Sequence, residues 1–440
     1  MTMKAKRWLP LLLSSVCAGW FASVHAEPLE TVLRWAEQND PVIAAARAAR
    51  AAGQEKEVQG RALLLPSLGA SADTFWNRVE IRGFEKHYNT NQWGVKLTQP
   101  LYRPQNWAQA KQAELQSELA ELQWRDAEQQ LVLRVAKAWF DVLTARAQLQ
   151  AAEELRAAAE GQLKLAKASF EVGTVTVVDV YEAQSRYDLA EAQVVAAKNG
   201  VAVAEAALVS ITGQAPQRYP RLKMDVKLLP PEPAELSAWE AAARADNLAV
   251  LQAQVAERIT KEELARRRAG HQPTVDLEAM VGNQRLFSQS SFSSADVDAA
   301  QIGVRVTIPL YAGGAITSQV REGAALLTQA QRNRDAAERQ AVLATKQAYL
   351  NVTNGLTRVK ALEAALASSL KNLEATKTGF EVGVRINLDV LNAQAQVADA
   401  RTQLAKARFD TLLALLQLKA AAGQLAASDL AQVDALFEEE

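Results

Sequence analysis

The sequence repeats itself once along its length. Residues 94–102 read GVKLTQPLY and residues 303–311 read GVRVTIPLY, so six of these nine positions are identical. Further along, residues 170–214 and 380–424 are identical at 15 of 45 positions without a gap. Similarity at a fixed interval indicates that one structural unit is present twice. Any fold assigned to one half therefore has to suit the other half as well.

We divide the chain into two equivalent halves with short additions. The expected parts are a secretory signal peptide (1–26), a first repeat (27–213), a proline-rich connector (214–233), a second repeat (234–423) and a C-terminal tail (424–440). The connector is assigned from its prolines at 216, 220, 230, 231 and 233, because proline interrupts regular helices.

The first 26 residues have the pattern of a secretory signal peptide. Basic residues at positions 4, 6 and 7 precede an apolar run over 8–24, and a small-residue cleavage site ends at Ala26. Cys17 is the only cysteine, and Val16 stands before it where lipoprotein processing requires a small residue. We therefore expect a mature chain that starts near Glu27, is not acylated and works outside the cytoplasm.

Two long stretches, 105–215 and 310–440, contain no proline, and both are rich in alanine and polar residues. They can therefore form long helices, and a helix over 104–169 would measure about 100 Å at ~1.5 Å per residue. In the second stretch, apolar residues keep a three-four spacing from Tyr349 to Phe380, with Glu363 and Lys377 filling two gaps. That spacing is typical of a coiled coil.

Each half also contains two segments that alternate between apolar and polar residues. These predicted strands cover about 66–79, 91–101, 273–284 and 300–310, with polar loops at 80–90 and 287–299. In the third strand, Val275, Leu277 and Ala279 alternate with Asp276 and Glu278. Such strands suit the wall of a membrane barrel, with the apolar residues toward lipid, and they also suit a soluble sheet.

Four strands cannot close a membrane barrel by themselves. Lipid offers no hydrogen bonds to an open sheet edge, so a membrane barrel must be closed. Either the sheet is soluble or several chains share one barrel, and three chains would supply twelve strands. The mature sequence has no uninterrupted apolar run near the ~20 residues that a membrane helix requires.

The motif FEVG occurs at 170–173 and again at 380–383, where a long helix is expected to end. Gly173 and Gly383 suit the left-handed conformation that closes helix C-termini. Asp179 and Asp389 then fall in the first turns of the next helices, where the helix dipole favours a carboxylate. From the residues alone, these turns are either hairpin corners only or corners that also bind a partner.

The ordered set of repeats, strands and turns resembles the TolC family of outer-membrane efflux and secretion channels. FEVGTVTVVDVYEAQSRYD and FEVGVRINLDVLNAQ resemble the two periplasmic turns of that family, and PSLGAS, GVKLTQPLY, PTVDLEA and GVRVTIPLY resemble its barrel strands. The resemblance implies a mainly α fold with a β-barrel portion. Three protomers would form a twelve-stranded barrel in outer-membrane lipid over an α-helical periplasmic tunnel.

The same resemblance implies partners and a gate at the tunnel tip. A periplasmic adaptor would contact Val172, Gly173, Thr174, Val382, Gly383 and Val384, and an inner-membrane ABC or proton-driven pump would complete the system. Five residues match positions of the family's gate. Asp179 and Arg385 match a salt-bridging pair, and Asp389 matches an acidic ring. The other two are Phe380 and Asn392. The last two depart from the family pattern, since the family has Tyr and an acidic residue there.

Composition narrows the classes of function further. The chain carries 49 Lys and Arg against 50 Asp and Glu, which is not the charge of a nucleic-acid-binding protein. With three histidines and one cysteine, we expect no enzyme, no metal site and no cofactor. We expect a type I secretion or multi-pump export channel. The alternatives are the channel of a dedicated multidrug pump and a periplasmic coiled-coil scaffold.

Overall fold

The computed structural model describes residues 27–81, 83–223, 226–288 and 293–438. The expected signal peptide therefore lies outside the described residues. The elements of the described residues are α1 (Leu29–Asn39), α2 (Pro41–Ala62), β1 (Ser67–Ile81), β2 (Phe84–Tyr102), α3 (Pro104–Glu171), α4 (Val177–Thr212), β3 (Arg221–Leu222), α5 (Leu236–Asp246), α6 (Leu248–Arg268), η1 (Ala269–His271), β4 (Thr274–Ser288), β5 (Ser293–Thr307), α7 (Ala315–Glu381), α8 (Asn387–Ala421), α9 (Ser428–Asp434) and β6 (Phe437–Glu438).

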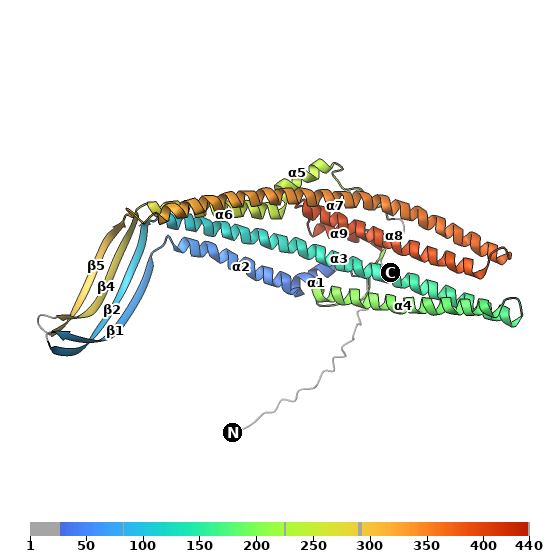
Figure 1. Cartoon of the computed structure of the whole chain (residues 1–440), viewed down its shortest axis with the longest axis horizontal. Helices are drawn as coiled ribbons and strands as arrows, with labels where there is room; N and C mark the ends of the chain where they lie inside the picture. The colour runs from blue at the N-terminus through green and yellow to red at the C-terminus, as the bar shows by residue number, and fades with distance from the viewer. Residues whose placement is uncertain (1–26, 82, 224–225, 289–292, 439–440) are drawn as a thin grey trace, which may run out of the picture.

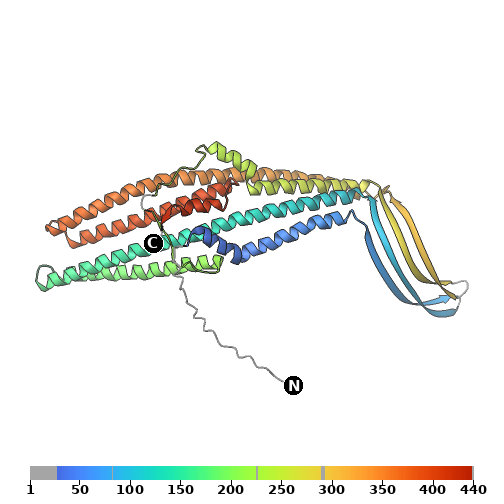
Figure 2. The same ribbon diagram turned by 180° about the vertical axis from the view of Figure 1, so that it is seen from behind.

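The molecule is elongated, with a curved sheet at one end and two helical hairpins at the other (Figures 1 and 2). The order helix, helix, strand, strand, long helix, helix occurs twice, which confirms the duplication. The helices α3 and α7 contain 68 and 67 residues and run from the sheet to the hairpin tips. At ~1.5 Å per residue each is about 100 Å long.

In the middle of the molecule, which we call the waist, one type of contact occurs in both halves. It joins the break between the first two helices of a half to the end of its last helix. The Asn39 side chain donates to the carbonyl of Thr212 at 3.0 Å, and the Asn247 side chain donates to the carbonyl of Ala421 at 2.8 Å. Each asparagine lies at the break between two short helices, where proline or a capping side chain starts the second helix. The duplicated sequence thus forms duplicated tertiary contacts.

The large sheet is antiparallel in the order β1-β2-β4-β5, so β1 and β5 are its two edges. Paired strands place Val275, Leu277 and Ala279 on one face and Asp276 and Glu278 on the other. One face is therefore apolar across all four strands, as the alternation predicted.

The polar face is held together by ion pairs. The Arg103 guanidinium donates two hydrogen bonds of 2.6 Å to Asp276, which is 3% exposed. Glu278 accepts from Lys96 at 3.2 Å and from Arg305 at 2.9 Å. Polar side chains that face each other across strands satisfy one another here.

The prediction of polar loops at 80–90 and 287–299 was wrong over most of their length. β1 and β2 pair through Glu80 and Glu85, and β4 and β5 pair through Arg285 and Asp296. Beyond the apolar band polar and apolar residues are mixed on both faces of the sheet, so the period-two hydrophobic signal ends while backbone pairing continues. Cross-strand pairs such as Arg285–Asp296, at 2.8 Å, hold this extension together.

The main hydrophobic core lies at the waist, where α1, α3, α4, α8 and the tail meet. Trp139 and Leu416 are buried there, together with Leu430 of α9. Asp434 of α9 accepts the amides of Leu29 and Glu30, at 2.8 and 3.1 Å, and so caps the start of α1. The tail is therefore an integral part of the waist.

Among the described residues, α4 alone combines the length and mean hydropathy of a membrane span, 1.6 over 18 residues. This criterion concerns length and composition only. In the structure α4 lies along α3 in the helical half, and 17% of that apolar window is buried. Leu189, Val195 and Val203 are exposed on it.

Candidate functional site

The first hairpin tip, between α3 and α4, has a backbone turn set by glycine. Gly173 has φ of 75°, in the left-handed region that favours glycine. Its amide donates to the carbonyl of Phe170 at 3.0 Å, and the Thr174 amide donates to the carbonyl of Ser169 at 2.9 Å. These two bonds are the Schellman pattern that satisfies the last carbonyls of a helix.

The second tip, between α7 and α8, repeats this turn. Gly383 has φ of 76°, and its amide donates to the carbonyl of Phe380 at 3.0 Å. The amides of Val384 and Arg385 both donate to the carbonyl of Gly379, at 2.8 and 3.0 Å. Both expected glycine caps are therefore present, at the end of the molecule opposite the sheet (Figures 1 and 2).

A carboxylate caps the helix that leaves each tip. Asp179 accepts from the amide and the hydroxyl of Thr176, each at 2.8 Å, and its own amide donates to that hydroxyl at 3.4 Å. These hydrogen bonds from the Thr176 hydroxyl and amide lower the pKa of Asp179. At the second tip, Asp389 accepts from the amide of Ile386 at 3.4 Å, and isoleucine has no oxygen to return the bond. The first cap is a full capping box and the second is half of one.

Arg385 is positioned by a glycine that the turn motif does not include. Its aliphatic stem lies over Gly379, where an added Cβ would come within 2.9 Å of the Arg385 Cγ. The guanidinium reaches Asp389 of the same hairpin, with Nη1 and Oδ2 3.7 Å apart. The first tip has Ser169 and Val175 at the matching positions, so it has neither the space nor the cation.

The expected pair Arg385–Asp179 is not formed within one chain, as far as the described residues extend. Asp179 is bonded to Thr176, and Arg385 lies beside Asp389. The latch formed by Arg385 and Asp179 therefore stays a prediction.

The expected adaptor-contact residues lie on exposed surface at the two tips. Val172, Val382 and Val384 are 74%, 69% and 78% exposed. Gly173, Thr174 and Gly383 are exposed between them. Val172 on the first turn and Val382 with Val384 on the second therefore leave apolar side chains in solvent at both tips.

The remaining gate positions have different surroundings. Phe380 is half-buried at the end of α7, and Asn392 is exposed on α8. The structure adds Thr176 and Gly379 to the residues that shape the tips. Thr176 stands three residues before Asp179, which is the spacing of a capping box. Comparing the two halves does not single out Gly379, because they also differ in side-chain volume at 174–178 against 384–388.

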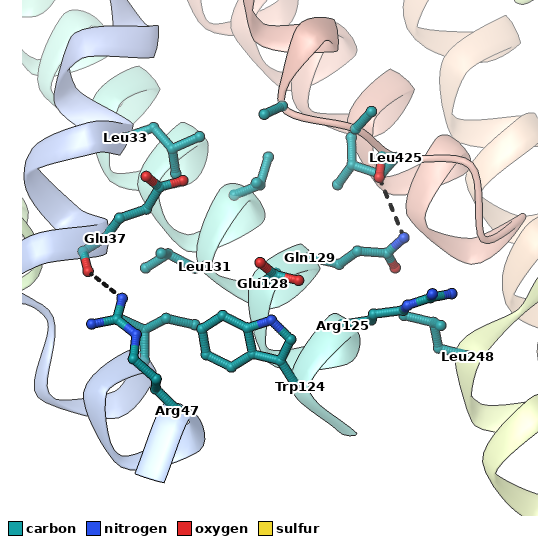
Figure 3. A pocket seen from close by; sticks show the side chains of 14 residues that line it. Leu33, Glu37, Arg47, Trp124, Arg125, Glu128, Gln129, Leu131, Leu248 and Leu425 are labelled. Atoms are coloured by element: carbon teal, nitrogen blue, oxygen red, sulfur yellow. Dashed lines mark hydrogen bonds between the residues drawn. The ribbon is translucent and has the colours of Figure 1, made fainter. Parts of the chain in front are cut away.

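A cavity of about 450 Å³ lies far from the tips, at the waist (Figure 3). Trp124, Arg125 and Glu128 of α3 line it together with Leu33 of α1 and Leu425 of the tail. Burial raises the pKa of Glu128. The lining mixes apolar groups with both signs of charge and does not define a ligand class. No cluster of metal-ligating side chains occurs within the described ranges.

Comparison with known proteins identifies the architecture. The family model for outer membrane efflux proteins matches residues 32–214 and 239–424, one match per half. The outer membrane protein TolC of Vibrio cholerae is 32% identical over 435 residues, which cover 98% of each chain. The protease secretion protein PrtF of Dickeya chrysanthemi is 30% identical, covering 99% of this chain and 96% of its own.

Solved structures show the same fold at lower sequence identity. The outer membrane channel CmeC of Campylobacter jejuni superposes with a TM-score of 0.76 at 16% identity, covering 98% of this chain and 94% of its own. CusC superposes with a TM-score of 0.77 at 18% identity, over 96% of this chain and 99% of its own. The sheet is accordingly the outer-membrane portion and the helical hairpins form the periplasmic tunnel. The chain belongs to the outer membrane efflux protein family.

Proposed function

We propose that this protein is the exit duct of a tripartite export system, working as a homotrimer with a periplasmic adaptor and an inner-membrane ABC or proton-driven pump. The observation that carries the proposal is the joining of two surfaces in one chain. A sheet with a continuous apolar face is connected, by unbroken helices of 68 and 67 residues, to two tips with exposed valines. One end suits lipid and the other suits a protein partner.

The edges of the single chain support a trimer. β1 and β5 each have a neighbour on one side only, and unpaired strand edges are costly in lipid. The helix α4 likewise exposes an apolar surface along the tunnel wall. Three copies would pair every edge and give a twelve-stranded barrel.

The cargo is proposed from the relatives. PrtF and the alkaline protease secretion protein AprF of Pseudomonas aeruginosa are named for protein secretion, and AprF is 27% identical over 415 residues. We accordingly favour type I secretion or use by several pumps. The second candidate is a dedicated multidrug pump, which is favoured by the outer membrane efflux protein BepC of Brucella suis at 27% identity over 340 residues.

The tips are proposed to contact the adaptor and to close the duct. The adaptor would meet the valines and glycines of the two FEVG turns, and the carboxylates and Arg385 would line the entrance.

A deletion strain tests the function and separates the two candidates. We expect the deletion to remove one or more proteins from the culture supernatant, and wild-type protein to restore them. Loss of drug resistance with an unchanged supernatant would favour the multidrug pump. Val384→Asp should prevent complementation while leaving the trimer intact, because it charges an exposed tip. Leu229→Asp, at a residue that is 73% exposed on the waist connector, is the matched control.

Fractionation separates the channel from the scaffold alternative. A channel should be recovered from outer-membrane extracts as a heat-resistant trimer. A soluble periplasmic pool without pore activity would contradict the proposal and support a scaffold.

A further inference from the structure

The two hairpins of the sheet are related by fixed sequence offsets. Ser67 pairs with Thr98 in the first hairpin and Thr274 pairs with Thr307 in the second. The strands β1 and β4 are thus offset by 207 residues, and their return strands β2 and β5 are offset by 209. Every other pair of the two hairpins follows the same offsets, so the hairpins have identical register.

The junction between the hairpins is visible within one chain. At this junction β2 pairs with β4, with Gly94 opposite Gly282 and Lys96 opposite Met280. In a ring of identical chains, the junction between β5 of one copy and β1 of the next is the equivalent of this one. The same offsets therefore convert the observed register into a register for the seam between copies.

We infer that β5 pairs with β1 of the adjacent copy so that Arg305 lies opposite the partner's Asp73, Val306 opposite the partner's Ala72 and Gly303 opposite the partner's Phe75. The inference rests on the proposed homotrimer with a shared barrel. It adds the residues that form its three seams.

The charges on the polar face agree with this register. Within one chain, Glu278 accepts from both Lys96 and Arg305, and the Arg305 side chain is 64% exposed. Asp73 has a neutral partner, the Gln92 amide, at 3.1 Å. Placing the partner's Asp73 opposite Arg305 continues a row of charges of alternating sign across the seam. The row runs from Lys96 through Glu278 and Arg305 to the partner's Asp73. Opposite charges facing each other across strands stabilise a sheet, and like charges destabilise it.

Side-chain volumes agree as well. Phe75 interrupts the polar face of β1 and is 57% exposed in the single chain. Gly303 has no atom within 4 Å of the position that a Cβ would occupy, so its face of the sheet is open. A phenyl ring directly opposite a glycine can cover that backbone. On the apolar face the same register brings together Trp76 and Ile302, which are 74% and 76% exposed.

A register shifted by two residues keeps the faces of the sheet but loses these matches. Arg305 would then face Ser71 or Phe75, and Asp73 would face Gly303 or Thr307. A shift by one residue is excluded on stronger grounds, since it turns the apolar face of one strand toward the lumen.

Disulfide cross-linking between copies tests the seam. Val306→Cys is combined with Cys17→Ala and with a cysteine at one of three positions on the same face of β1: Ala70, Ala72 or Thr74. Residues directly opposite have Cβ atoms about 4.5–5.5 Å apart, while diagonal neighbours are about 7–8 Å apart. A disulfide requires a Cβ separation of about 3.5–4.5 Å, so one pair should dominate. Single-cysteine variants control for assembly, and heat-resistant trimer is measured for each.

The inferred register predicts several-fold more cross-linked chains for the pair of positions 72 and 306 than for either other pair. A lumen-facing pair, Ser71→Cys with Thr307→Cys, should cross-link in parallel and serves if the first set assembles poorly. A maximum at position 70 or 74 would overturn the register but leave the shared barrel intact. Heat-resistant trimers that cross-link at none of these positions would overturn the pairing of β5 with β1 and, with it, the shared barrel.

Discussion

At the second hairpin tip, the guanidinium of Arg385 is exposed and within reach of one carboxylate of its own chain. Its distance of 3.7 Å to Asp389 is that of a loose surface pair, and such pairs are weak and easily screened. An arginine in this state can exchange Asp389 for a carboxylate of the next protomer at little cost. The position therefore suits a latch that opens when a partner arrives.

We expect Arg385→Ser to raise single-channel conductance in planar bilayers without lowering the trimer yield. Added salt should produce part of the same increase in the wild type by screening the pair. Lys377→Ser removes an exposed cation near the end of α7, just before the same tip, and is the matched control. If conductance is unchanged in both Arg385→Ser and Asp179→Ala, closure depends on packing at Phe170 and Phe380.

Gly423 is a second residue whose replacement has a clear expected effect. It has φ of 73°, and an added Cβ would lie 2.1 Å from the carbonyl oxygen of Asp246. Gly423→Ala should therefore destabilise the waist by more than the ~1–2 kcal/mol of left-handed strain alone. Gly161→Ala, in open space within α3, should instead be neutral or stabilising. Thermal loss of the trimer measures both, and equal midpoints would contradict this assignment of the close contact.

At this scale the sequence predicted backbone requirements better than side-chain partners. The left-handed glycines at 173 and 383 and the capping positions of Asp179 and Asp389 follow from the motif, because they depend on local geometry. The partner of Arg385 depends on how its stem packs. That packing is decided by Gly379, whose role becomes visible only in three dimensions.

Among the elements, the strands show where a hydrophobic pattern stops being informative. The alternation predicted the four strands only where one face is apolar, since the polar extensions beyond it lack that signal. The long helices were easier to predict because proline is absent from their interiors. The three-four spacing in α7 corresponds to buried Val352 and Val359, and Glu363, which fills a gap in it, pairs with Arg408 of α8 at 2.7 Å.

A charge on the apolar face of β4 should disrupt assembly. Leu277→Arg places a cation toward lipid, at a cost of about 2–4 kcal/mol near the bilayer midplane. Gln301→Arg, on the polar face of β5, is the better control than a change at Glu278, because Glu278 holds two cations in place. We expect heat-resistant trimer to be lost in the first variant and kept in the second. Similar losses in both would mean that the alternation of a lipid-facing and a lumen-facing side is misread.

At the level of the whole molecule, the order of the helices around the tunnel was not predictable from either half. Both halves have the same pattern, so the sequence cannot say which helices of different halves are neighbours. In the structure α3 packs along α2, α4, α6 and α8, which makes it the central helix of the chain. α4 and β1 remain at one side and α7 and β5 at the other.

This arrangement predicts a closed ring, and the proposed function gives that ring three copies. Chemical cross-linking in native membranes should give species of one, two and three chains and should stop there. The reason is that the two flanks of each chain are paired only when the copies close into a ring, so no further copy can be added. Detergent-stable single chains with pore activity would contradict the shared barrel. Intact-mass measurement of the same material should give a chain beginning near Glu27, and a lipid-modified terminus at Cys17 would contradict the expected processing.

Because α3 and α7 are unbroken, they also fix the distance between the sheet and the tips. A continuous helix cannot stretch or fold to follow its surroundings, so the tips stand at one depth, about 100 Å below the sheet. In the proposed export system, the inner-membrane components must then span whatever distance remains in the cell envelope. Any change in the width of the periplasm has to be absorbed on their side of the junction, or export through this protein stops.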